Sequence, residues 1–172
     1  MMLKKSLIAV LALPFVALGG QAFAQQYSAA TLAKIEELKI MARDKRDMVE
    51  SMPGIKKVTG DELKAWLDEG RKFVLLDNRV PGDYEKEHIP GSARLAPDDL
   101  QPDPKLAAKY GKDDIIVNYC NGIKCWRSSG TMVLMQDQGY KNLYWYRDGL
   151  PDWVKKGYAT AEGKEPGAWK KK

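Results

Sequence analysis

Residues 115–128 read IIVNYCNGIKCWRS and contain both cysteines of the chain. The run 115–119 is apolar and rich in β-branched residues, which favours a buried strand. It delivers Cys120 to a short loop that closes with Arg127 and Ser128 before another apolar run. A strand that brings a cysteine to a loop ahead of a helix N-terminus forms an anion-binding site, because free backbone N–H groups and the helix dipole both stabilise a thiolate there. A nucleophilic cysteine requires this environment.

The segments around this stretch alternate between strands and helices. Strands are predicted at 73–76, 92–95, 115–119 and 142–146, and helices at 28–52, 59–70, 129–138 and after residue 148. Thr59 and Glu62 match a capping box. Alternating strands and helices predict an α/β fold with a parallel sheet. Ligands of such sheets bind beyond the carboxyl ends of the strands, where Cys120 lies.

The first 24 residues have the features of a secretory signal peptide. Lys4 and Lys5 form a basic start, residues 6–18 are apolar, and Ala22 and Ala24 flank Phe23 in a small-x-small cleavage signal. The apolar run is interrupted by a proline and is shorter than the ~20 residues that span a bilayer. We expect cleavage after Ala24 and a periplasmic mature protein, with an uncleaved anchor as the alternative.

Charge and composition exclude several classes of partner. The formal net charge is +5, but the basic residues are interspersed with acids and form no stripe with interleaved aromatics, so we expect no nucleic-acid partner. No set of cysteines and histidines has the spacing of a zinc site, and we expect neither a metal nor a cofactor. Beyond the signal peptide no stretch is apolar enough for a membrane helix, so no stable membrane insertion is expected after cleavage.

Several separated motifs resemble those of the rhodanese-like domain, a sulfurtransferase family. The resemblance covers roughly 56–158 and rests on the order and spacing of the motifs as well as on their residues. These motifs are VLLDNR at 74–79, DY at 83–84, HIPGS at 88–92, GYKNL at 139–143 and DGLPDW at 148–153.

The resemblance implies both a fold and a reaction. The fold is a three-layer α/β structure in which helices flank a central, mostly parallel sheet. The expected organisation is a signal peptide at 1–24, a helical extension at 25–54, the rhodanese-like domain at 55–158 and a flexible tail at 159–172. The implied nucleophile is Cys120. It would take a sulfane sulfur from a donor such as thiosulfate, become a persulfide, and pass the sulfur to a thiol acceptor, either a small molecule or a periplasmic protein.

The loop after Cys120 departs from the family pattern. It is longer than the family's loop, and Asn121 stands where the family often has an arginine. Lys124 could replace that charge, but the wider loop leaves the substrate class open between small sulfur-containing anions or persulfides and phosphate- or arsenate-like anions. The predicted substrate-binding loop comprises Asn121, Gly122, Ile123, Lys124, Cys125, Trp126 and Arg127.

The second cysteine has three interpretations. Cys125 could resolve a Cys120 persulfide or sulfenate, hold Cys120 in a resting disulfide, or simply fill the loop. Export favours a disulfide. A purely structural bridge would more usefully close a long loop, so the short spacing favours local chemistry.

Two further functions stay open: a thiol–disulfide redox protein, and a non-catalytic accessory module. The Cys125–Trp126 pair resembles exported rhodanese-like proteins found near PQQ-dependent oxidation systems, with which such a module would be associated.

Other polar residues have structural alternatives. Arg127 could neutralise a substrate anion or brace the loop. His88 belongs to the HIPGS turn and is expected to be structural. Asp77 and Arg79 are also expected to be structural, Asp77 as an acid at the end of a strand and Arg79 as a buried ion-pair partner.

Overall fold

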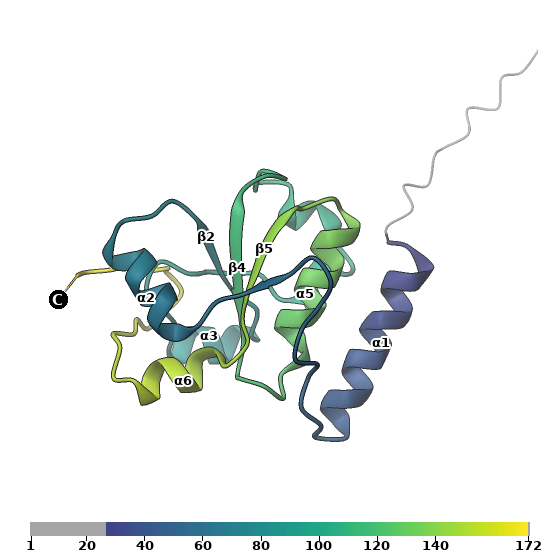
Figure 1. Ribbon diagram of the computed structural model, residues 1–172, viewed down its shortest axis with the longest axis horizontal. Coiled ribbons are helices and arrows are strands. Elements are labelled where there is room, and N and C mark those ends of the chain that lie inside the picture. Colours follow the sequence, from purple (N-terminus) through teal and green to yellow (C-terminus); the bar gives the residue numbers. More distant parts are fainter. Residues whose placement is uncertain (1–26, 172) are drawn as a thin grey trace, which may run out of the picture.

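The computed structural model describes residues 27–171, in which helices cover both faces of a five-stranded parallel sheet (Figure 1). The predicted signal peptide lies outside the described residues. The strands are β1 (Lys56–Lys57), β2 (Val74–Asp77), β3 (Ala93–Arg94), β4 (Ile115–Tyr119) and β5 (Asn142–Tyr146), in the spatial order β1-β5-β4-β2-β3. The predicted α/β fold is confirmed. Within the described residues, every helix is too short or too polar to cross a bilayer.

The register of the central strands brings their carboxyl ends to one edge. Tyr119 of β4 pairs with Asp77 of β2 on one side and with Tyr146 of β5 on the other. All three residues end their strands, so the segments that follow emerge together. Cys120 therefore leaves the sheet from its central strand, with connecting segments on both sides.

Each face of the sheet is covered by its own set of helices. Ile116 and Val117 are neighbours on β4, and both are fully buried because successive side chains point to opposite faces. Ile116 joins the cluster formed with α1 and α5, whereas Val117 joins the cluster formed with α2 and α6 (Figure 1). The helices are α1 (Ala29–Arg43), α2 (Gly60–Asp68), α3 (Pro81–Lys86), α4 (Pro97–Leu100), α5 (Trp126–Asp137) and α6 (Gly149–Lys155), with a 3-10 turn at Pro104–Ala107.

The start of α2 follows the predicted capping box. The Thr59 hydroxyl accepts the Glu62 N–H at 3.2 Å, and the Glu62 carboxylate accepts the Thr59 N–H at 2.8 Å. Two N–H groups that a helix start would leave unpaired are thereby satisfied.

The N-terminal helix is shorter than predicted. The sequence predicts a helix over 28–52, but α1 ends at Arg43, and Lys45 adopts a positive φ of 57° that a helix cannot continue through. Met48 is nevertheless buried, in a non-helical segment that crosses the domain. The chain beyond Arg43 therefore packs on the domain without being helical, and Leu32 within α1 is 39% exposed.

Residues 159–171, predicted to form a flexible tail, contact the domain at several points. Ala161 and His88 exchange both backbone hydrogen bonds, each at 2.8 Å. The Trp169 indole donates to Asp68 at 2.9 Å and lies edge-on to Trp153, with ring centroids 5.7 Å apart. The small and charged residues of this segment suggest a solvated end, but one tryptophan provides enough apolar surface to anchor it.

Buried phenols predict a loss of stability at alkaline pH. Burial raises the pKa of Tyr119 and Tyr146 well above the ordinary value, and raises the pKa of Tyr27 to about 12. Unfolded tyrosines ionise near pH 10, whereas these folded ones stay protonated, so the folded state holds more protons and stability falls as pH rises above about 10. Urea midpoints measured from pH 7 to pH 11 should stay level to about pH 9.5 and then decline.

Tyr27→Phe provides the comparison for this effect. The variant loses the hydrogen bond from the Tyr27 hydroxyl to the Leu100 carbonyl, so it should be less stable at pH 8. Above pH 10 its midpoint should decline less steeply than that of the wild type. A wild-type midpoint that does not change between pH 9 and pH 11 would contradict the prediction.

Candidate active site

Cys120 lies directly after β4 and is bonded to the second cysteine. Its side chain is nearly inaccessible, and the structure joins Cys120 and Cys125 in a disulfide with the two Cα atoms 6.1 Å apart. The Cys120 carbonyl accepts the Leu150 N–H at 2.9 Å, which fixes the backbone of the cysteine against the start of α6. Cys125 is thus a bonded partner of Cys120 in this state and does more than fill the loop.

The sulfur atoms lie at the N-terminus of α5. Cys125 is the N-cap residue of α5, and no side chain caps the helix there. The first turn of α5 has N–H groups without intrahelical partners, and the helix dipole, equivalent to roughly half a positive charge, is positive at this end, next to the disulfide. The helix begins at Trp126, whereas the sequence predicts 129, because the prediction relied on the apolar run and a cysteine gives no capping signal.

Two glycines allow the loop to approach the start of α6. Gly122 has a φ of 90°, and a Cβ on it would lie 3.2 Å from the Asp148 carbonyl. Gly149 has a φ of 64°, and a Cβ on it would lie only 2.2 Å from the Cys120 carbonyl oxygen. Sequence reasoning recognised the motif at 148–153 but missed this role of Gly149. The sequence feature that could have indicated this role is the position of Gly149 shortly after the end of β5 at Tyr146.

The middle of the loop is fixed by the segment that follows α1. The Ile123 carbonyl accepts the Met48 N–H at 2.8 Å. Lys124 Nζ donates to the Lys45 carbonyl at 2.8 Å and pairs with Asp47 at 3.1 Å. Lys124 is exposed, and its ammonium is directed to the N-terminal segment.

Arg127 braces the loop against α4. Its guanidinium makes two hydrogen bonds to Asp98, from Nε at 2.7 Å and from Nη2 at 3.2 Å. The neighbouring Trp126 ring is partly exposed and lies beneath Lys39, with the ammonium 5.4 Å from the ring centroid. Of the two roles considered for Arg127, the structure shows bracing.

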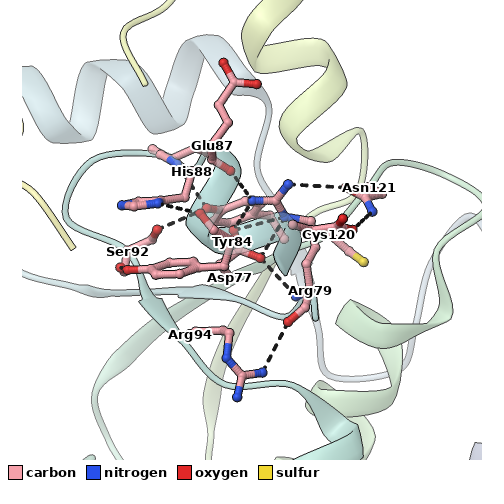
Figure 2. Close-up of polar contacts among 12 residues, drawn as sticks. Asp77, Arg79, Tyr84, Glu87, His88, Ser92, Arg94, Cys120 and Asn121 are labelled. Atoms are coloured by element: carbon pink, nitrogen blue, oxygen red, sulfur yellow. Dashed lines mark hydrogen bonds and ion pairs between the residues drawn. The ribbon is translucent and has the colours of Figure 1, made fainter. Parts of the chain in front are cut away.

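A buried ion pair reaches the loop from β2 (Figure 2). Arg79 donates from Nε and Nη2 to the Asp77 carboxylate, the shortest contact being 2.6 Å, and from Nη2 to the Glu87 carbonyl. Its Nη1 lies 3.4 Å from Asn121 Oδ1, and Asn121 Nδ2 donates to Asp83 at 2.8 Å. Burial opposes the charge on Arg79, but its hydrogen bonds and attraction to Asp77 outweigh burial and raise its pKa. The predicted ion pair is present, and it positions Asn121.

The surroundings of His88 indicate a structural role, as expected from the HIPGS motif. The ring is fully buried and stacks on Tyr84 at 4.0 Å between centroids, with Nδ1 2.8 Å from the Tyr84 carbonyl. Figure 2 shows it on the side of Tyr84 away from Cys120. Over residues 27–171, no cluster of His, Cys, Asp and Glu has the geometry to hold a metal ion.

Comparison with known proteins identifies the family. The model of the rhodanese-like domain matches residues 59–156, more than half of the chain, so the chain belongs to the rhodanese-like domain family. The probable adenylyltransferase/sulfurtransferase MoeZ of Mycobacterium tuberculosis is 33% identical over 99 residues, which cover 57% of this chain and 24% of that protein. The rhodanese-like domain-containing protein 8 of Arabidopsis thaliana is 26% identical over 121 residues, covering 63% of this chain and 26% of that protein. The chain therefore spans about a quarter of the length of these relatives.

Solved structures share the fold. The BH2092 protein of Bacillus halodurans superposes with a TM-score of 0.58 at 15% identity, covering 78% of this chain and 88% of that one. A thiosulfate sulfurtransferase of Pseudomonas aeruginosa gives 0.54 at 16% identity, covering 83% and 25%. A single-domain sulfurtransferase of Saccharomyces cerevisiae gives 0.52 at 20% identity, covering 64% and 95%. The predicted family is confirmed by the match over residues 59–156, and these structures share its fold.

Proposed function

We propose that the mature protein is a periplasmic sulfurtransferase that carries a sulfane sulfur as a persulfide on Cys120. The observation that supports it most is the position of Cys120, directly after the central strand and with its sulfur at the uncapped N-terminus of α5. That position stabilises the thiolate form of Cys120, both when it attacks the donor and when it leaves after the sulfur is transferred. Periplasmic location rests on the predicted signal peptide, and a disulfide suits an oxidising compartment.

The reaction begins with reduction of the Cys120–Cys125 disulfide by a dithiol, which supplies two electrons and two protons and is itself oxidised to a disulfide. The Cys120 thiolate then attacks the outer sulfur of the donor, and the bond within the donor breaks with its electron pair on the leaving group. An acceptor thiolate next attacks the outer sulfur of the persulfide. Cys120 leaves as a thiolate, and the α5 N-terminus stabilises it.

Intact mass tests the proposal. Reduced Cys125→Ser protein, in which the persulfide cannot be resolved internally, should gain the mass of one sulfur atom when treated with a sulfane-sulfur donor. The matched control, Cys120→Ser/Cys125→Ser, should gain nothing. If neither thiosulfate nor an alkyl persulfide adds sulfur to Cys125→Ser, the sulfurtransferase function is excluded. A Cys120 no more reactive toward iodoacetamide than a model thiol would then favour an accessory module.

The disulfide supports a second candidate function, thiol–disulfide exchange through Cys120 and Cys125. The same bond predicts how a persulfide is discharged in the wild type. The Cys125 thiolate would attack Sγ of Cys120, re-forming the disulfide and releasing the outer sulfur as hydrosulfide. Reduced wild type loaded with one equivalent of donor should therefore release about one equivalent of sulfide and lose its free thiols, whereas Cys125→Ser should retain the sulfur.

Turnover separates the two functions. If Cys125→Ser passes sulfur to an added thiol as fast as the wild type, Cys125 is dispensable for transfer and the redox function is excluded. If the variant loses all activity toward dithiols and disulfides while Cys120 never gains sulfur in any form, thiol–disulfide exchange replaces sulfur transfer as the function.

A further inference from the structure

The cations around the loop are neutralised by carboxylates. This holds for each lysine or arginine that lies in the loop at 121–127, ends β3, or follows β2 or β5 within two residues. The pairs are Arg79–Asp77 at 2.6 Å, Arg94–Asp99 at 2.7 Å, Lys124–Asp47 at 3.1 Å, Arg127–Asp98 at 2.7 Å and Arg147–Glu50 at 3.0 Å.

Two further acidic residues lie at this edge of the sheet. Asp83 accepts a hydrogen bond from Asn121, the residue directly after the nucleophile. Asp148 follows β5, and its carbonyl lies beside Gly122 of the loop. An arginine at position 121 would supply a positive charge. The residue at this position is Asn121, which is neutral, and its side-chain amide donates a hydrogen bond to Asp83.

From this charge pattern we infer that the sulfur donor is a low-mass alkyl persulfide, R–S–SH, and not the thiosulfate dianion. The inference rests on the proposed transfer of sulfur to Cys120. A carboxylate about 3 Å from a cation cancels most of its field at the distance of a substrate. What remains for an anion is the N-terminus of α5, which offers roughly half a positive charge. That suffices for one thiolate but leaves the second charge of a dianion without a partner.

The transfer step suits this donor. The Cys120 thiolate attacks the outer sulfur of R–S–SH, a new sulfur–sulfur bond forms on Cys120, and the bond to the R–S sulfur breaks. The electron pair departs on R–S⁻, and the proton of the outer sulfur moves to that leaving thiolate, which departs as R–SH. One negative charge is present before and after the step, and it stays beside α5. No oxidant or reductant is needed.

The test measures single-turnover sulfur loading of reduced Cys125→Ser with 2-hydroxyethyl persulfide, whose alkyl group carries no charge, and with thiosulfate, each divided by its rate with a small model thiol. Dividing by the model-thiol rate corrects for the difference in intrinsic reactivity between the two donors. The normalised rate should be at least about tenfold higher for the persulfide. Added salt should raise the thiosulfate rate, because it screens a repulsive field, and should affect the persulfide rate less.

Variants show whether the carboxylates are responsible. Asp98→Asn frees Arg127, and Asp83→Asn removes the acid beside Asn121; both are at least partly exposed, so the fold should tolerate them. Each should raise the ratio of the thiosulfate rate to the persulfide rate roughly threefold or more, from the Coulomb energy of one charge acting on a dianion. The matched control is Asp113→Asn, which makes the same change in net charge before the opposite end of β4 and should alter neither rate.

The outcomes distinguish a failure of this inference from a failure of the proposed sulfur transfer on which it rests. A normalised thiosulfate rate above the persulfide rate, or a thiosulfate rate that falls with salt, overturns the inference and leaves sulfur transfer at Cys120 standing. Absence of loading by either donor excludes the proposed function, and the inference falls with it. The salt dependence is measured on Cys125→Ser and requires neither carboxylate variant, so it decides the matter even if Asp98→Asn or Asp83→Asn impairs folding.

Discussion

Replacing Asp77 with asparagine is expected to lower the free energy of unfolding by about 3–5 kcal/mol, because it leaves the charge of Arg79 buried without its counter-ion. Asp77 is fully buried, and its carboxylate accepts the Arg79 backbone N–H at 2.9 Å as well as the guanidinium. The asparagine amide has one acceptor oxygen and no charge, so it satisfies only part of this set. Urea denaturation of the reduced proteins measures the loss.

Asp113→Asn is the control for the same chemical change at an exposed ion pair. Asp113 pairs with Lys141 at 3.0 Å, and both side chains are more than two-thirds exposed, so the loss should be below about 1 kcal/mol. Equal losses at the two sites would contradict the assignment of Asp77 as a buried counter-ion. Asp77→Asn should also slow sulfur loading of Cys120, since Arg79 contacts Asn121 next to the nucleophile.

The features that sequence predicted well are those decided by neighbours along the chain. The strand at Ile115–Tyr119 follows from one apolar run, and the capping box at Thr59 from two residues on one turn. The Asp77–Arg79 pair is equally local, with its partners two positions apart. These contacts join residues that are close in the sequence, so short patterns indicate them.

The features that sequence missed depend on distant partners. Lys124 stands 79 positions from the carbonyl it binds, and Arg127 stands 29 positions from Asp98. Nothing in the loop itself indicates that these cations are already paired, so the sequence left them as candidate substrate contacts. The packed C-terminal segment has the same cause, since Trp169 is anchored by Asp68 on α2. The charge of the candidate site is therefore a property of the tertiary structure, although its nucleophile is visible in the sequence.

Gly149→Ala is expected to be among the most damaging single substitutions near the site. The new Cβ would lie 2.2 Å from the Cys120 carbonyl oxygen and 2.7 Å from the Gly122 nitrogen, both backbone atoms that cannot turn aside. The positive φ of 64° adds roughly 1–2 kcal/mol for any residue with a Cβ. Relief of the overlap, which typically costs a further 1–3 kcal/mol, requires the loop and the start of α6 to separate. Urea denaturation should show a loss of about 2–5 kcal/mol.

Gly70→Ala separates the two contributions. Gly70 has nearly the same φ, 66°, but a Cβ there would meet no atom within 4 Å, so its loss should be limited to the backbone cost. The excess in Gly149→Ala then measures how tightly α6 is packed on the nucleophile's backbone. Because a shift of about 1 Å in a reacting group can cost on the order of a hundredfold in rate, sulfur loading of Cys120 should fall strongly in Gly149→Ala and stay unchanged in Gly70→Ala. Equal stability losses with equal loading rates would mean that the start of α6 yields freely and does not position Cys120.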